Sequence, residues 1–331
     1  IDSKKGGFSW IVRKSNKEVL PWNLDKVIDL EKTAEQFILK MTNKCSYLIG
    51  EDVLPKQSLL YEEYNLLNHF NVIRINGERL SKVEKEALIE NIAKKRVNVT
   101  YQTIAKYFDN RLKKDVTITG IDEEMKLSLS SFHKFNKIFP GRINNEPQNA
   151  KLMRNLEKIV FLGTIYSSQV DFTNRLKSDK EFNKFFSTEE ISKMANLRFK
   201  GWGSFSRLLL TGFDELSKSN DKVITYQDEK TGNELSIIEI MREEPLNFNE
   251  VLFHEKYQFS KLISEFNHEG DSELSVDELI DNYYVSPAVR RSIRRTLKIV
   301  DEVIATNNGI IPDKIFVEVT REDEKTRKGK G

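Results

Sequence analysis

A recurring helix start signal is the feature that most constrains the fold of this 331-residue chain. Ser81 is followed three residues later by Glu84, the capping-box pattern in which a hydroxyl and a carboxylate satisfy the first turn of a helix. Thr100, Ser187 and Ser275 open further stretches of this kind, each with apolar residues at helical spacing or early acids. The pattern predicts helix after helix joined by short loops across residues 23–283.

The stretch 23–41 is predicted to form one helix, with Asn23 as its cap and apolar residues at helical spacing. Strand candidates are few, namely residues 116–121 and 314–320. No fixed repeat period is present, so a regular solenoid is not expected. The sequence therefore predicts a mainly α fold with an irregular helical body.

Length and composition favour a globular chain of two or more units. The length exceeds the size at which single cores stop growing, and hydrophobic residues make up 38% of the sequence. The longest apolar runs, such as 159–163, are too short to span a bilayer, and the first residues lack an apolar signal core. Cys45 has no second cysteine to pair with, and the four dispersed histidines show no zinc-ligand spacing. A cytoplasmic protein without a membrane segment or a structural zinc is expected.

Basic residues gather at the C-terminal end, although the net charge of the chain is only +2. Residues 286–331 hold 11 Lys and Arg against 7 Asp and Glu. Within them, Ser286 and Pro287 begin a predicted helix with an apolar stripe on one face. Its other faces carry cations, which form either a solvated basic face or a phosphate-facing surface. These cations are Arg290, Arg291, Arg294, Arg295 and Lys298.

Glu318 lies in the predicted strand 314–320, on the face opposite Ile315, Val317 and Val319. An acid at such a position is commonly a solvated surface residue. It can equally be a ligand, since a strand holds a carboxylate in a fixed place. The strand pattern alone leaves both interpretations open.

Seven segments, taken in order, resemble the family of type II CRISPR-associated RNA-guided endonucleases. Each segment alone is a weak match, but the seven occur in the family's order at comparable spacing across nearly the whole chain. They are FSWIVRKS, PWNLDKV, FILKMTN, VLPKQSLLYEEYNLLN, GWGSFSRLLL, SPAVRRSIRRTLKIVDEV and DKIFVEVTRED.

The resemblance implies a domain organisation. Residues 1–42 would end the first recognition domain, 43–283 would be a helical recognition domain that contacts the guide–target heteroduplex, and 284–331 would be a helix-strand segment of the RNase H-like (RuvC) nuclease fold leading toward an HNH domain. Glu318 matches the family's catalytic, metal-binding glutamate, with Mg²⁺ as the cofactor of the intact protein. The family's other nuclease acids lie in segments outside this sequence, so the chain alone is expected to be inactive and not to hold the metal.

The resemblance also implies nucleic-acid contacts at five positions outside the C-terminal helix. Other interpretations remain open for four of them: Lys56 as a surface lysine, Tyr61 as a core residue, and the two asparagines as helix caps. Trp202 is expected to be a packing anchor more than a base-stacking platform. Ser204 and Glu250 depart from the family pattern and put local contact strength in doubt. The five positions are Asn43, Lys56, Tyr61, Arg207 and Asn247.

The implied partners are guide RNA (crRNA and tracrRNA) and target DNA, with the chain acting as a monomer in a bacterial cytoplasm and reading A-form shape and phosphates. Two alternatives differ in class. A helical protein-interaction scaffold, for example the target of an anti-CRISPR inhibitor protein, would suit the nearly neutral body. A self-sufficient metal-dependent nuclease would need further acids on adjacent strands, which the few predicted strands do not provide.

Overall fold

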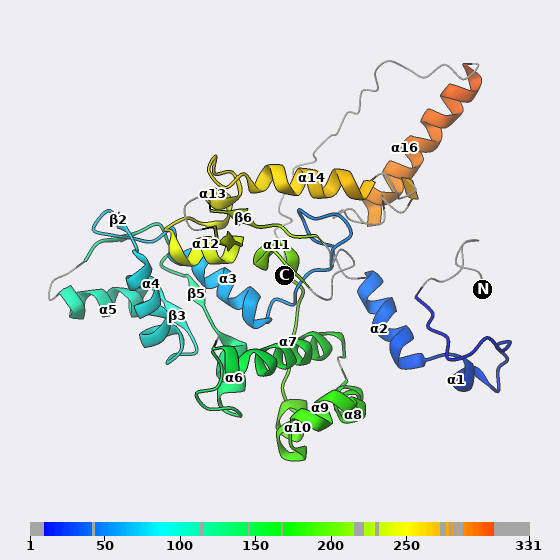
Figure 1. The fold of residues 1–331 in the computed structure, drawn as a ribbon, viewed down its shortest axis with the longest axis horizontal. Helices are drawn as coiled ribbons and strands as arrows, with labels where there is room; N and C mark the ends of the chain where they lie inside the picture. The colour runs from blue at the N-terminus through cyan, green and yellow to red at the C-terminus, as the bar shows by residue number, and fades with distance from the viewer. Residues whose placement is uncertain are drawn as a thin grey trace, which may run out of the picture. The chain divides into compact units, whose positions relative to one another are not determined.

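The computed structural model divides the chain into two compact units, residues 1–284 and 285–331, and each is considered by itself (Figure 1). The structure describes residues 10–41, 44–112, 116–144, 146–166, 168–214, 222–228, 232–271, 276–277, 280 and 287–307.

The described residues are mainly helical, as the sequence predicts. Seven short strands pair antiparallel in three small sheets, ordered β2-β1-β4, β3-β5 and β6-β7. The strands are β1 (Arg74–Ile75), β2 (Glu78–Arg79), β3 (Val99–Thr100), β4 (Ile118–Thr119), β5 (Lys126–Leu127), β6 (Tyr226–Gln227) and β7 (Glu234–Leu235). The helices of the first unit are α1 (Leu24–Val27), α2 (Leu30–Met41), α3 (Leu59–Phe70), α4 (Lys82–Leu88), the π-helix η2 (Ile89–Ala93), α5 (Tyr101–Leu112), α6 (Ser130–Asn136), the 3-10 helix η3 (Pro147–Asn149), α7 (Ala150–Ile165), α8 (Gln169–Ser178), α9 (Lys180–Phe185), α10 (Thr188–Ala195), α11 (Arg207–Thr211), α12 (Ile237–Glu243), α13 (Phe248–Leu252) and α14 (Phe259–Asp271). The second unit contributes α16 (Pro287–Thr306).

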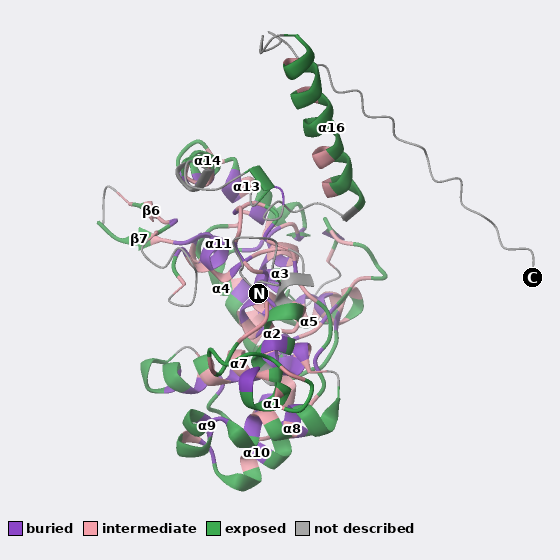
Figure 2. Ribbon diagram, turned by 90° about the vertical axis from the view of Figure 1, so that its right-hand side faces the viewer, coloured by how far each residue is buried: buried purple, intermediate pink, exposed green. Residues whose placement is uncertain are grey.

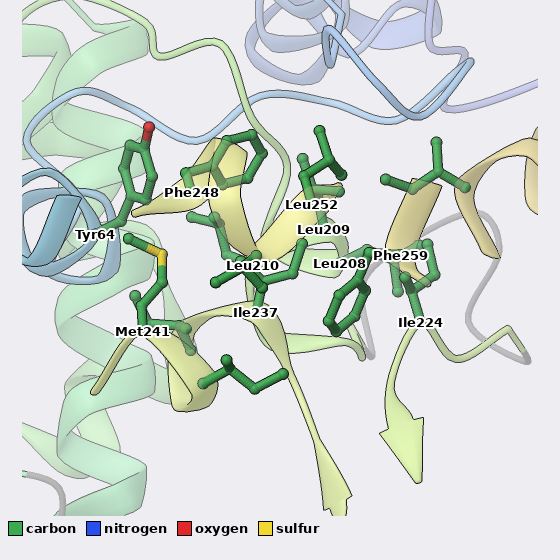
Figure 3. Close-up of a cluster of buried hydrophobic side chains, with 14 of the residues drawn as sticks. Tyr64, Leu208, Leu209, Leu210, Ile224, Ile237, Met241, Phe248, Leu252 and Phe259 are labelled. Atoms are coloured by element: carbon green, nitrogen blue, oxygen red, sulfur yellow. The ribbon is translucent and has the colours of Figure 1, made fainter. Parts of the chain in front are cut away.

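Three hydrophobic clusters build the core of the first unit, and α3 contributes to all of them. Leu67 packs with α11–α14, Leu66 packs with α4, η2, α5 and the sheets β2-β1-β4 and β3-β5, and Leu59 covers the cluster of α6–α10. Figure 2 shows buried residues on α3 and α11 and in the interior of the other helices of this unit. Figure 3 shows the first cluster, where Tyr64 and Phe248 converge with the side chains of α11 and α12. Helix α3 is therefore enclosed by neighbours on several sides.

A buried lysine joins α3, α4 and α12. Lys85 is only 1% exposed, and its ammonium donates hydrogen bonds to Asn71 Oδ1 (2.8 Å), the Met241 carbonyl (2.8 Å) and the Glu244 carbonyl (2.7 Å). Burial lowers the pKa of Lys85 to about 8, and the nearby Glu244 charge opposes this shift. The three acceptors match the three N–H groups of the ammonium, so the geometry suits the charged form.

Glu62 joins α3 to the start of α6 in a comparable way. Both carboxyl oxygens lie within hydrogen-bonding distance of the Ser131 backbone N–H, at 2.9 and 3.1 Å. Burial raises the pKa of Glu62 to about 8, more than the Ser131 hydrogen bonds and the Lys134 charge lower it. At neutral pH this carboxyl is therefore mostly protonated.

The start signals at Ser81, Thr100 and Ser187 are confirmed, the one at Ser275 lies outside the described residues, and one long predicted helix is wrong. Capping boxes begin α4 at Ser81 and α10 at Ser187. The predicted helix 23–41 is instead two helices, because Ile28 is extended and forms a β-bridge with Arg13. Asn23 precedes α1 but makes no side-chain cap; its Oδ1 accepts from the Leu20 N–H.

The strand predicted at 116–121 is confirmed only at β4, and the strand predicted at 314–320 lies outside the described residues. In the part of the chain that the structure describes, no helix is both long and apolar enough to cross a membrane.

Glu62→Gln should remove a pH dependence of stability. Between pH 4.5 and about 8 the folded chain keeps a proton that the unfolded carboxyl releases, so the free energy of unfolding falls as pH rises through this range. We expect wild type to lose roughly 2–4 kcal/mol across it, and the variant to lose much less. Urea unfolding at pH 5 to 8 measures this. Glu181→Gln, at an exposed carboxyl, should keep the wild-type slope, and an equally steep slope in Glu62→Gln would contradict the assignment.

Candidate nucleic-acid interface

Two segments far apart in the sequence pair along their backbones and form the candidate site. The Leu54 N–H donates to the Phe205 carbonyl (2.9 Å), the Gly203 N–H to the Leu54 carbonyl (2.7 Å), and the Lys56 N–H to the Gly201 carbonyl (2.9 Å). The Ser46 N–H also donates to the Ser204 carbonyl. We call this pairing of residues 46–57 with residues 200–206 the seam.

The seam brings Lys56 and Tyr61 together with the GWGSFSR segment. Lys56 is exposed, and the aliphatic part of its side chain lies next to Gly201, whose φ of +82° suits glycine. The Tyr61 hydroxyl accepts from the Ser204 N–H at 3.1 Å, and its ring lies directly over Gly203. Tyr61 thus has the packing role that its helical spacing indicates, at the edge of a potential contact surface.

Trp202 packs against the protein at this point. It forms a β-bridge with Pro55, and its ring meets Phe161 of α7 edge-on with centroids 5.7 Å apart. Both contacts support the interpretation of Trp202 as a packing anchor.

Arg207 begins α11 next to the seam and faces a carboxylate. Its Nη2 lies 3.5 Å from Oε2 of Glu157, in α7. The other oxygen of Glu157 accepts hydrogen bonds from the Leu60 N–H (2.9 Å) and the Ser58 hydroxyl (3.2 Å), at the start of α3. Glu157 therefore links three helices, and Arg207 already has a counterion.

Two pockets of about 580 and 530 Å³ adjoin this ion pair. Both are lined by four of the same residues, Arg154, Glu157, Arg207 and Thr211. The larger pocket extends to Glu62, Lys85 and the apolar residues between α3, α4 and α6, and the smaller one reaches Phe161 and the exposed Phe213. The candidate site thus combines cations, aromatic faces and open space.

Asn247 has a structural role near the other end of α3. Its Oδ1 accepts from the Glu250 N–H (3.0 Å), and Glu250 accepts from the Asn247 N–H (2.9 Å), a capping box that begins α13. Glu250 also binds both terminal nitrogens of Arg79, at 2.8 and 2.5 Å, which lowers the pKa of Glu250. The interpretation of Asn247 as a cap is confirmed, and the structure does not bring it to the seam.

The second unit carries the predicted basic helix. α16 begins at Pro287, as expected, and the guanidinium-bearing residues Arg290, Arg291, Arg294 and Arg295 lie in its first half. Arg291 and Arg295 are exposed. Apolar side chains of the helix are also exposed within this unit, among them Ile299 at 59% (Figure 2).

Two predicted site residues, Asn43 and Glu318, lie outside the described residues. Among the residues that are described, no group of three or more His, Cys, Asp or Glu side chains could hold a metal ion.

Sequence reasoning missed Glu157 and the burial of two ionisable groups, Glu62 and Lys85. Glu157 lies 97 residues from Leu60, and charged residues are usually assigned to the surface. A signal for Glu62 was nonetheless present, since it shares a helix face with Leu59, three residues before it, and Leu66, four residues after it.

Comparison with known proteins defines the class. The family profile of the REC lobe of CRISPR-associated endonuclease Cas9 matches residues 1–255, so the chain belongs to the Cas9 REC-lobe family. It is 28% identical over 98% of its length to CRISPR-associated endonuclease Cas9 of Listeria innocua, and 26% identical over 98% to that of Streptococcus mutans. It is 25% identical over 88% of its length to the protein of Staphylococcus aureus. The chain spans about a quarter of the length of these relatives, covering 23%, 24% and 24% of them respectively.

Gly203→Ala should weaken the seam. An added Cβ would lie 2.5 Å from Tyr61 Cε2 and 2.9 Å from the Leu54 carbonyl oxygen, closer than real Cβ contacts. We expect a loss of roughly 1–3 kcal/mol in the free energy of unfolding, measured by urea denaturation. In a Tyr61→Ala background the same substitution should cost less, since the ring is gone. An equal cost in both backgrounds would show that Tyr61 does not limit the space.

Proposed function

We propose that this chain is a nucleic-acid-binding recognition lobe that holds a guide RNA–target DNA heteroduplex through its backbone. The observation that carries the proposal is the seam, which holds Lys56 and has Tyr61 and Arg207 beside it although two distant segments supply these residues. Cations beside aromatic rings and open pockets suit a phosphate backbone without selecting a base sequence. Membership of the Cas9 REC-lobe family supports this function.

The proposal extends to the positions that the structure leaves untested. Residues 1–42 would end a first recognition domain, residues 43–283 would form the heteroduplex-contacting domain, and residues 284–331 would belong to a RuvC-like nuclease domain. The exposed apolar residues of α16 support the last assignment, because such a helix needs a partner surface. Asn43 and Asn247 would add contacts to sugar or phosphate.

The basic residues of α16 would face phosphates in the same assembly. Guanidinium groups suit this role because they bind phosphate oxygens in pairs. The residues in question are Arg290, Arg291, Arg294 and Arg295.

Binding of an RNA–DNA heteroduplex should be sequence-independent and strongly weakened by salt. With two or three phosphate contacts, raising the salt from about 50 to 200 mM should reduce affinity roughly 10- to 50-fold. Fluorescence anisotropy with a labelled heteroduplex and a shuffled-sequence control measures both properties. Affinity that does not change with salt would argue for the other class of function, a protein-interaction scaffold.

Glu318→Ala tests the nuclease assignment in a full-length protein that carries this segment. We propose that Glu318 supplies one carboxylate to a divalent-metal site in a RuvC-like domain, with the remaining ligands coming from other segments. The variant should lose cleavage of one target strand and keep guided binding. A strand-labelled target distinguishes the results, and wild-type cleavage of both strands would make Glu318 a surface acid.

A further inference from the structure

The ion pair between Arg207 and Glu157 is looser than the pair between Arg242 and Glu63 in the same unit. Arg207 Nη2 lies 3.5 Å from Glu157 Oε2. By contrast, Arg242 places Nε and Nη2 at 2.7 and 2.9 Å from the two oxygens of Glu63. A two-point pair at hydrogen-bond distance fixes the guanidinium plane, whereas a contact at 3.5 Å acts mainly through charge. Arg207 is thus held weakly by its carboxylate.

The carboxylate in this pair is fixed independently of the arginine. Glu157 Oε1 accepts from the Leu60 N–H at 2.9 Å and from the Ser58 hydroxyl at 3.2 Å. The Glu157 side chain is 14% exposed, and that of Arg207 is 31% exposed. If the two separate, Glu157 keeps its place and the guanidinium moves.

Both pockets open next to Arg207. The positive and negative side chains that line the smaller pocket are equal in number. That pocket is lined by three cations and three carboxylates, so loss of the Glu157 charge would leave it with a positive excess. The cations are Arg154, Lys158 and Arg207, and the carboxylates are Asp52, Glu157 and Asp214.

We propose that Glu157 is an internal competitor of nucleic-acid phosphate for Arg207. In the free chain the carboxylate occupies the guanidinium, and on binding a backbone phosphate oxygen replaces it. Each binding event therefore includes the separation of an existing ion pair, which reduces the net gain. This inference rests on the proposed heteroduplex-binding function and adds that Glu157 sets its strength.

Glu157→Gln is the direct test, because glutamine keeps an oxygen acceptor for Leu60 and Ser58 and loses the charge that holds Arg207. With a labelled RNA–DNA heteroduplex at low salt, we expect about fivefold tighter binding than wild type. Arg207→Gln should bind more weakly, and the double variant should match Arg207→Gln. Glu157→Asp, which keeps the charge on a shorter side chain, should lie between wild type and Glu157→Gln and provides a second variant.

Glu189→Gln is the matched control for net charge. Glu189 is 78% exposed in α10, pairs with Lys193 and lines neither pocket, so its neutralisation should change affinity less than twofold. A gain equal to that of Glu157→Gln would overturn the inference, because overall charge would then explain it. So would a gain from Glu157→Gln that persists without Arg207.

The test separates the two proposals. Salt-sensitive binding by wild type with no gain in Glu157→Gln or Glu157→Asp would overturn the role of Glu157 and leave the proposed function standing. Failure of all folded variants and wild type to bind the heteroduplex would overturn the proposed function itself. Thermal unfolding of each variant establishes that it is folded.

Discussion

Enclosure of α3 is the constraint on which the first unit depends. Polar side chains that α3 places against these clusters are shielded from water, so they need partners from neighbouring elements. The partners lie in α4, α6, α12 and α13, so these hydrogen bonds and ion pairs also hold those four helices against α3. The pairs are Glu62 with the Ser131 N–H, Glu63 with Arg242, Asn68 with the Phe248 N–H, and Asn71 with Lys85. In this unit the same contacts therefore pair the polar side chains of α3 and position the helices that pack against it.

Helices and strands whose formation depends on residues within one turn could be predicted from the sequence. Those whose formation depends on pairing with distant residues could not. The capping boxes at Ser81 and Ser187 act within one helical turn, so their patterns are sufficient. The break before α2 depends on Ile28 pairing with Arg13, and apolar spacing alone continues the helix through it. The two-residue strands likewise exist through their partners, which explains why 116–121 shortens to β4.

The same distinction applies to the candidate site. Lys56, Tyr61 and Arg207 were identifiable because their segments resemble a family, and the structure places Lys56 in the seam with Tyr61 and Arg207 beside it. The resemblance gave no indication that Arg207 already faces Glu157. Asn247 shows the opposite case, in which a local cap explains the residue completely. A motif match therefore shows where a residue lies in the fold more reliably than it shows which group that residue contacts.

The seam also determines the order in which this unit can form. Its hydrogen bond between Ser46 and Ser204 joins residues 158 positions apart, and the α6–α10 cluster lies within the intervening chain. Helices α8, α9 and α10 contact one another over short sequence distances, so that cluster can condense early, whereas closing the seam must bring distant ends together. On the ribosome residues 46–57 emerge long before residues 200–206 exist. This segment must remain without its backbone partner during that interval, and the pairing that assembles the site is a late event of folding.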